Sequence, residues 1–209
     1  MKEQNFEREL PAGYGQVYHI NAKDKKIGIV LNLIALAILA AVMLIAAIPV
    51  MLADGVDFSI DDLLSLLVGY AVFFVSMILY IVLHEAVHGI AYKSLTGEQL
   101  TFGLSWSCAF CGVPNIFTYR KTALVALAAP LVTFTVILLP VTVCLWFVHP
   151  LAYFAGALLL GLHLGGCCGD MYMILLLCTK FKQRALLMKD TGPEQFLYLP
   201  VEGKGTDGQ

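Results

Sequence analysis

The sequence predicts an all-α membrane protein with four transmembrane helices and a short β-hairpin in the loop between helices two and three. Its 209 residues are 59% hydrophobic and 13% charged, whereas soluble domains are ~45–50% apolar and ~25% charged. Four apolar segments each exceed the ~20 residues that a helix needs to cross a bilayer. These segments are Ile27–Leu52, Leu63–Tyr92, Thr122–Val148 and Leu151–Cys178.

The first helix is predicted to be a retained anchor. Its apolar run is far longer than the 7–15-residue core of a secretory signal, so residues 1–26 are expected to remain as a cytoplasmic N-terminal segment. Helices one and three contain no charged residue and are predicted to act as scaffold. Prolines are expected to kink or break both helices: Pro49 in the first, and Pro130 and Pro140 in the third.

The second helix contains a metal-binding signature, His84-Glu85-Ala86-Val87-His88. On a helix the two histidines lie on one face, so both imidazoles can bind one Zn²⁺, and Glu85 can reach a zinc-bound water. Zinc lowers the pKa of such a water to roughly 7, and a carboxylate can then accept its proton. The alternative is a histidine and a glutamate that bond each other near the lipid headgroups.

The loop at residues 93–121 is predicted to form a cytoplasmic β-hairpin. Residues 100–106 and 113–119 are rich in β-branched and aromatic side chains, on either side of a turn with cysteine and glycine. An irregular loop is the alternative. Cys108 and Cys111 form a CxxC without a second pair nearby, so they are predicted to be ordinary loop cysteines, with metal or redox chemistry as the alternative.

The fourth helix supplies the candidate third ligand, Asp170. His84 and Asp170 lie about 31 Å and about 28 Å along their helices from the outer ends, so they fall at similar depth. His163 is the rival, and Cys167 and Cys168 are weaker candidates because buried thiols usually pack as small hydrophobes. Glycines at residues 161, 165 and 169 form GxxxG patterns that predict close approach of another helix.

The basic residues predict the orientation in the membrane. All lysines and arginines lie in residues 1–26, 93–121 and 180–209, and the connections at residues 53–62 and 149–150 contain none. The positive-inside rule therefore predicts a multi-pass cell-membrane protein with both termini and the long loop in the cytoplasm. Residues 27–180 form the predicted transmembrane domain. Residues 181–209 form the predicted cytoplasmic tail, whose part after Asp190 either docks through the apolar residues 196–199 or is disordered.

These features together resemble a bacterial membrane family of unknown function, described as "putative zincin peptidases". The likeness rests on the residues His84–Gly89 in the second helix, Ala129-Pro130 in the third and Gly169-Asp170 in the fourth, and it covers most of residues 60–200. The chain is more distantly similar to the site-2 proteases, which carry HExxH in one transmembrane helix and an aspartate ligand in a later one. The resemblance implies His84, His88 and Asp170 as zinc ligands and Glu85 as the catalytic base.

The predicted function is that of an intramembrane zinc metalloprotease that hydrolyses membrane or juxtamembrane peptides. Its predicted partners are the lipid bilayer and a membrane-protein or peptide substrate; no basic patch interleaved with aromatic residues suggests nucleic acid. The alternative is a non-catalytic metal-binding membrane protein, such as a transporter, sensor or scaffold. Transport is less favoured because helices one and three offer few polar groups for an ion path.

Overall fold

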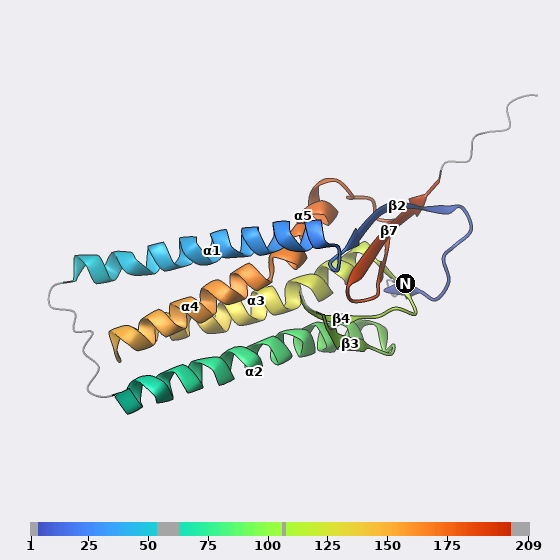
Figure 1. Ribbon diagram of the computed structural model, residues 1–209. Coiled ribbons are helices and arrows are strands. Elements are labelled where there is room, and N and C mark those ends of the chain that lie inside the picture. Colours follow the sequence, from blue (N-terminus) through green and yellow to red (C-terminus); the bar gives the residue numbers. More distant parts are fainter. Residues whose placement is uncertain (1–3, 54–62, 106–107, 202–209) are drawn as a thin grey trace, which may run out of the picture. The chain divides into compact units, whose positions relative to one another are not determined.

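The computed structural model describes residues 4–53, 63–105 and 108–201, which are mostly helical (Figure 1). The helices are α1 (Lys25–Leu52), α2 (Leu63–Thr96), α3 (Arg120–Leu145), α4 (Pro150–Gly166) and α5 (Cys168–Thr179). The strands are β1 (Phe6–Glu7), β2 (Tyr14–Asn21), β3 (Thr101–Leu104), β4 (Ala109–Gly112), β5 (Phe117–Tyr119), β6 (Leu187–Asp190) and β7 (Glu194–Pro200).

The four predicted apolar segments are helical, but the fourth is not one helix. Within the described residues, α1, α2 and α3 are long and apolar enough to cross a membrane. The fourth segment is broken at Cys167, where α4 and α5 meet with a bend of 46°. The structure therefore supports three candidate spans, or four if the bent pair counts as one.

The prolines do not interrupt their helices. α1 continues through Pro49, and α3 continues through Pro130 and Pro140. The predicted breaks are therefore absent from these described helices. Helices in apolar surroundings tolerate proline because neighbouring groups and small local adjustments satisfy the backbone groups that proline leaves unbonded.

The chain forms two compact units. We call Met1–Gly28, Glu85–Ala128 and Tyr172–Gln209 the strand unit, and Ile29–His84 with Ala129–Met171 the helix unit. The limits of both units fall inside helices, so each unit contains parts of helices that continue into the other.

The strand unit contains an antiparallel sheet that the all-α prediction missed. Its order is β1-β5-β6-β7-β2 among the described strands, and β2 and β7 run side by side over their length (Figure 1). The strands come from the N-terminal segment, the 93–121 loop and the C-terminal segment. Residues 196–199 lie in β7, where Leu197 is fully buried, so this part of the tail docks.

The predicted hairpin exists, but with a different second strand. β3 pairs with β4, placing Phe102 opposite Cys111, and Ser105 N–H donates to the Cys108 carbonyl across the turn at 2.8 Å. The segment 113–119, predicted as the second strand, instead contributes β5 to the larger sheet. Trp106, at the end of the first predicted strand, lies outside the described residues.

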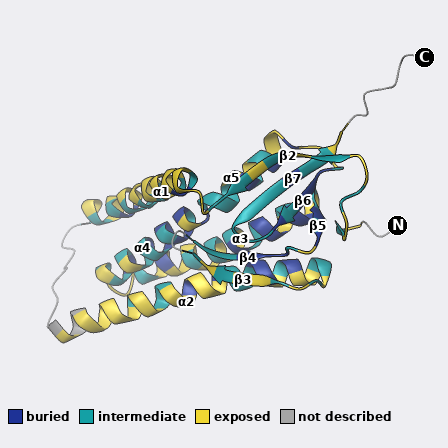
Figure 2. Cartoon of the chain, turned by 45° about the vertical axis from the view of Figure 1, so that its right-hand side comes forward, coloured by how far each residue is buried: buried dark blue, intermediate teal, exposed yellow. Residues whose placement is uncertain are grey.

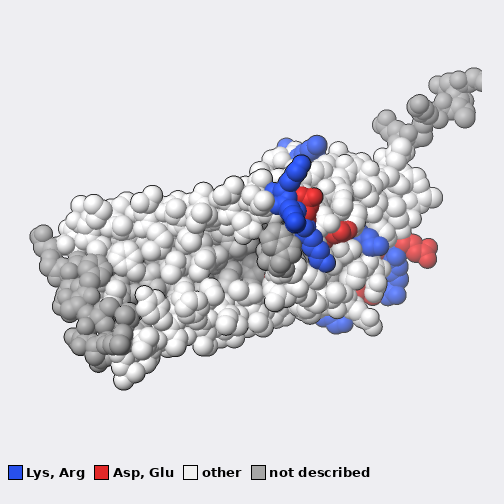
Figure 3. Space-filling model, viewed as in Figure 1, with Lys and Arg blue, Asp and Glu red and all other residues white. Residues whose placement is uncertain are grey.

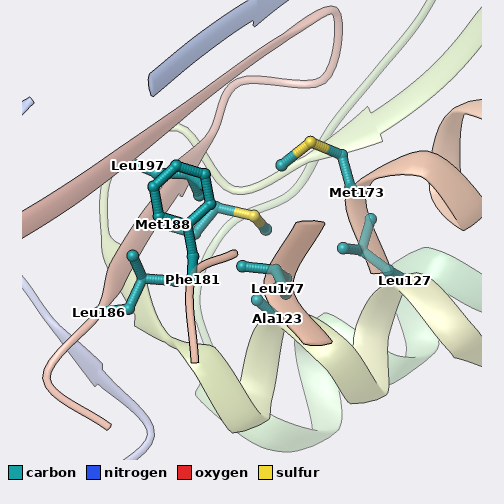
Figure 4. Packing of buried hydrophobic residues seen from close by; sticks show 8 residues of the cluster. All are labelled: Ala123, Leu127, Met173, Leu177, Phe181, Leu186, Met188 and Leu197. Carbon is teal, nitrogen blue, oxygen red and sulfur yellow. The ribbon is translucent and has the colours of Figure 1, made fainter. Parts of the chain in front are cut away.

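A buried apolar cluster lies between the sheet and the helices of the strand unit (Figure 4). Leu197 and Met188 come from the sheet, and Leu177 comes from α5. Leu177 and Leu197 are both fully buried. Burial of side chains of this size stabilises a fold by about 1.5–3 kcal/mol each. The cluster therefore fixes the sheet to the ends of α3 and α5.

The helix unit presents apolar side chains on its outside. Much of the surface of α1 and of the first part of α2 is exposed (Figure 2), including Leu33, Leu44 and Phe74. On the face drawn in Figure 3, charged side chains gather on the strand unit, whereas the drawn surface of the helix unit has none. An exposed apolar surface of this kind is compatible with a membrane protein.

Two glycines of the predicted GxxxG pattern bring α4 against α1. A Cβ on Gly165 would meet the backbone of Ala35, and a Cβ on Gly161 would meet Leu39. The predicted close helix contact is therefore confirmed at these two positions. Gly166 and Gly169 have nothing within 4 Å of such a Cβ, so they do not contribute to it.

Candidate metal centre

His84 and Asp170 face each other inside the helix unit. His84 lies on α2 and is 8% exposed, and Asp170 is in the first turn of α5. The Nε2 atom of His84 is 3.5 Å from Oδ2 of Asp170. Among the residues of this unit that the structure describes, Asp170 is the only Asp, Glu, Lys or Arg. A lone carboxylate in such apolar surroundings indicates a functional site.

The break at Cys167 positions this carboxylate. α4 ends at Gly166, and Cys167 caps it, with its N–H bonded back to the carbonyls of His163 and Gly165. α5 then begins at Cys168 in a new direction, with Asp170 near its start. The N-terminal end of a helix favours negative charge, because its first N–H groups are unsatisfied and the helix dipole is positive there. The break therefore places the Asp170 carboxylate at the N-terminal end of a helix.

The distance between His84 and Asp170 fits two ligands of one zinc ion. A separation of 3.5 Å is longer than the usual 2.7–3.2 Å of an N–H···O hydrogen bond. Two ligand atoms at about 2.0–2.1 Å from a tetrahedral zinc lie roughly 3.4 Å apart. Histidine nitrogen with carboxylate oxygen is also a donor set of catalytic zinc sites. The residues present therefore fit this metal.

His163 lies close to His84 but is linked to it through Tyr80. The Tyr80 hydroxyl is 3.0 Å from Nδ1 of His84 and 2.8 Å from Nδ1 of His163. His163 is fully buried, and its Nε2 atom is 3.0 Å from Oγ1 of Thr135. The rival third ligand thus takes part in a buried hydrogen-bond network behind His84.

A second group of potential ligands shares His84. Ligand atoms of His84, His163 and Cys167 all lie within 4.8 Å of one another. Cys167 Sγ is 3.6 Å from Nδ1 of His163, the atom that Tyr80 also contacts. An ion at this point would have to displace the Tyr80 hydroxyl, whereas an ion between His84 and Asp170 would not. We therefore favour a metal position between His84 and Asp170.

His88 and Glu85 belong to the strand unit and follow His84 on the same continuous helix, α2. His88 is 7% exposed, and its Nδ1 atom is 2.9 Å from the carbonyl oxygen of Ala126. Because a carbonyl only accepts, Nδ1 must donate, and the lone pair of the ring lies on Nε2. Metal-binding histidines are commonly oriented in this way by a backbone carbonyl. Glu85 is half-buried.

Cys111 lies near Glu85 within the strand unit. Burial raises the pKa of its thiol to about 12, and the negative charges of Glu85 and Asp190 add to this. At neutral pH the thiol is therefore protonated, whereas metal binding and disulfide exchange require the thiolate. This favours the prediction that Cys111 is an ordinary loop cysteine.

A family model matches residues 77–185, more than half of the chain, and its description is "Putative zincin peptidase". The chain belongs to this family. The match includes His84, Glu85, His88 and Asp170, and the description supports a metallopeptidase at a coarse level. No curated protein and no solved structure matches the chain. The more distant similarity to site-2 proteases thus stays a prediction from the motif.

Two residues beside the candidate ligands were not identified as site residues from the sequence, although both lie in the segment that matches the zincin family. Tyr80 is not among the predicted site residues, although it precedes His84 by four residues and so lies on the same face of α2. Thr135, in the predicted third helix, is not among them either. The periodic spacing of residues 80, 84 and 88 could have identified Tyr80, whereas nothing local indicates the partner of Thr135.

Proposed function

We propose that the chain is an intramembrane zinc metallopeptidase whose ligands are His84, His88 and Asp170. The observation that carries this proposal is the 3.5 Å separation of His84 Nε2 and Asp170 Oδ2, in a unit with no other described charged side chain. The helical spacing of four residues adds His88 on the face of α2 that carries His84. Membership of the zincin family supports the same chemistry.

Zinc at this centre would supply a Lewis acid and would lower the pKa of water to roughly 7. Glu85 would accept the proton of the attacking water and pass it to the leaving amine. It follows His84 directly on α2, so its side chain is turned by about 100° from that of His84. The Ala126 carbonyl would hold the ring of His88 in its metal-binding orientation.

We further propose that the sheet of the strand unit lies on the cytoplasmic side of the membrane. The sheet pairs β2 from the N-terminal segment, β5 from the 93–121 loop and β7 from the C-terminal segment within one unit. The same three segments contain all lysines and arginines of the chain. This arrangement supports the positive-inside orientation. Substrates would then be peptides within the membrane or close to its cytoplasmic surface.

The first test is zinc content per chain in detergent-purified protein. We expect about one zinc in the wild type and a large loss in His84→Ala and in Asp170→Ala. His19→Ala is the matched control, because His19 lies in β2 and contacts Glu194 and Phe196 rather than the candidate ligands. A wild-type protein that is folded and zinc-free after supplementation would refute the proposal.

The second test separates a peptidase from a non-catalytic metal protein. Membrane-peptide libraries would be incubated with the wild type and with Glu85→Gln, and new termini would be identified by mass spectrometry. Cleavage by the wild type alone supports the peptidase. Zinc binding with identical products from both proteins would exclude Glu85 as the base. Zinc binding with no cleavage by either would favour a transporter, sensor or scaffold.

A further inference from the structure

The Tyr80 hydroxyl bridges two buried histidines behind the candidate metal centre. It contacts Nδ1 of His84 at 3.0 Å and Nδ1 of His163 at 2.8 Å. Tyr80 is itself 8% exposed, and all three residues lie within the helix unit. The hydroxyl therefore contacts the ring nitrogen of His84 opposite the one that faces Asp170.

The donors and acceptors of this network can be arranged in one consistent direction. His84 donates from Nδ1 to the Tyr80 oxygen, and the Tyr80 hydroxyl donates to Nδ1 of His163. His163 then donates from Nε2 to Oγ1 of Thr135, 3.0 Å away. In this direction each imidazole has one donor and one acceptor nitrogen. In this arrangement the lone pair of His84 lies on Nε2, the atom that faces Asp170.

The opposite direction is also self-consistent and has the same number of protons. Thr135 then donates to His163, His163 to Tyr80, and Tyr80 to Nδ1 of His84. His84 must now carry its proton on Nε2, where it points at Asp170 and cannot bind a metal. The direction of the network therefore determines whether His84 presents a lone pair or a proton to the metal centre.

We propose that Tyr80 is a positioning residue that holds the ring of His84 and accepts a hydrogen bond from its Nδ1, so that Nε2 presents its lone pair to the metal, with His163 and Thr135 as support for Tyr80. This inference rests on the proposed function, because it requires a metal at Nε2 of His84. It assigns His163 a role other than that of a ligand. Groups that hydrogen-bond to the second nitrogen of a metal-bound histidine are a general determinant of metal affinity.

The aromatic ring of Phe134 on α3 restricts the same side chains. It packs edge-on against Tyr80, with ring centroids 5.2 Å apart, and lies parallel to His84 at 6.3 Å. It also contacts His163 at 5.9 Å. With the rings held in place, the Tyr80 hydroxyl is positioned to accept a hydrogen bond from Nδ1 of His84 when Nε2 binds a metal.

The decisive variant is Tyr80→Phe, which removes the hydroxyl and keeps the ring. Zn²⁺ affinity would be measured by competition with a chelator, and the Co²⁺ derivative would be examined by visible absorption. We expect 10- to 100-fold weaker Zn²⁺ binding, the usual effect of removing such a partner, together with shifted Co²⁺ bands. A residue that serves only the fold would change the melting temperature and leave the Co²⁺ bands in place.

Tyr70→Phe is the matched control. It is the same substitution on the same helix, at an exposed position, and we expect wild-type affinity and wild-type bands. Thr135→Val provides a second variant that perturbs the far end of the network, with an expected loss of about tenfold in affinity. It decides the inference if Tyr80→Phe does not fold.

The outcomes separate this inference from the proposed function. If the wild type binds zinc, His84→Ala does not, and Tyr80→Phe binds with unchanged affinity and spectrum, the positioning role is wrong and the metal centre stands. If the folded wild type binds no metal, both are wrong. Weaker binding with shifted bands in Tyr80→Phe, but not in Tyr70→Phe, supports both.

Discussion

Gly165 of α4 and Ala35 of α1 are in backbone contact. A Cβ on Gly165 would lie 2.8 Å from the carbonyl oxygen of Ala35, closer than side-chain carbons approach other atoms. The neighbour at this point is backbone and cannot rotate away. α4 leads directly into the break at Cys167 and the turn that carries Asp170, so this contact helps to set the position of the carboxylate.

We therefore predict that Gly165→Ala lowers the melting temperature in detergent. Forcing a methyl group into a packed contact costs about 1–3 kcal/mol. Gly166→Ala is the control, because nothing lies within 4 Å of its Cβ position and replacing a helical glycine stabilises by roughly 0.5–1 kcal/mol. Equal effects of the two substitutions would contradict the close contact.

Removal of zinc is expected to destabilise the wild-type protein. A ligand that binds only the folded state, at a concentration 100 times its Kd, adds about 2.7 kcal/mol to the free energy of unfolding. A chelator should therefore lower the melting temperature of the wild type and restoration of zinc should recover it. His84→Ala should melt at the same temperature with and without the chelator. A chelator effect that persists in this variant would place the metal elsewhere.

Glu85→Gln is expected to keep zinc and to lose cleavage. The substitution preserves size but removes the carboxylate that accepts the proton, and general base catalysis contributes typically 10²–10⁴-fold to the rate. Zinc content and cleavage rate would be measured on the same preparation. Loss of zinc in this variant would indicate a ligand or structural role for Glu85 instead.

Asp190 should make stability depend on pH. Burial raises its pKa to about 6, although hydrogen bonds from Tyr92 and Gly192 oppose the shift. The folded state then binds a proton more tightly than the unfolded state, whose pKa is near 3.8. Between these two values the contribution of Asp190 to stability falls as pH rises.

The measurement is the melting temperature of wild type and Asp190→Asn from pH 4 to pH 7, in chelator so that metal binding does not contribute. Loss of one hydrogen bond gives the variant a constant penalty, because Asn has a single acceptor oxygen. As pH rises, the melting temperature of the variant should increase relative to that of the wild type. A difference independent of pH would show that Asp190 titrates below this range.

The orientation of the termini can be tested with single cysteines. Lys23 and Lys182 are exposed residues of the strand unit. In Lys23→Cys and Lys182→Cys, an impermeant thiol reagent should label both positions above the parental background in inverted vesicles and neither in right-side-out vesicles. Labelling of the two positions from opposite sides would be incompatible with the pairing of β2 and β7.

The helices and the HExxH spacing could be predicted because both are local properties of the chain. A long apolar run specifies a helix in lipid without reference to other segments, since every backbone group bonds within the run. Two histidines four residues apart share a face on any helix. The pairing of His84 with Asp170 was expected from similar depth, and the structure brings these two side chains within 3.5 Å. The ligand assignment itself remains a prediction.

The sheet, the break at Cys167 and the role of Tyr80 depended on the tertiary structure. The described strands are two to eight residues long, and their partners are distant in sequence, as Thr118 with Met188 illustrates. Such short segments have no internal pattern that identifies the partner. Likewise, the residue type of Tyr80 does not reveal that His163 and Thr135 lie behind it. Local apolar content therefore determined the helices of this protein, whereas pairings between remote segments were decided only by packing.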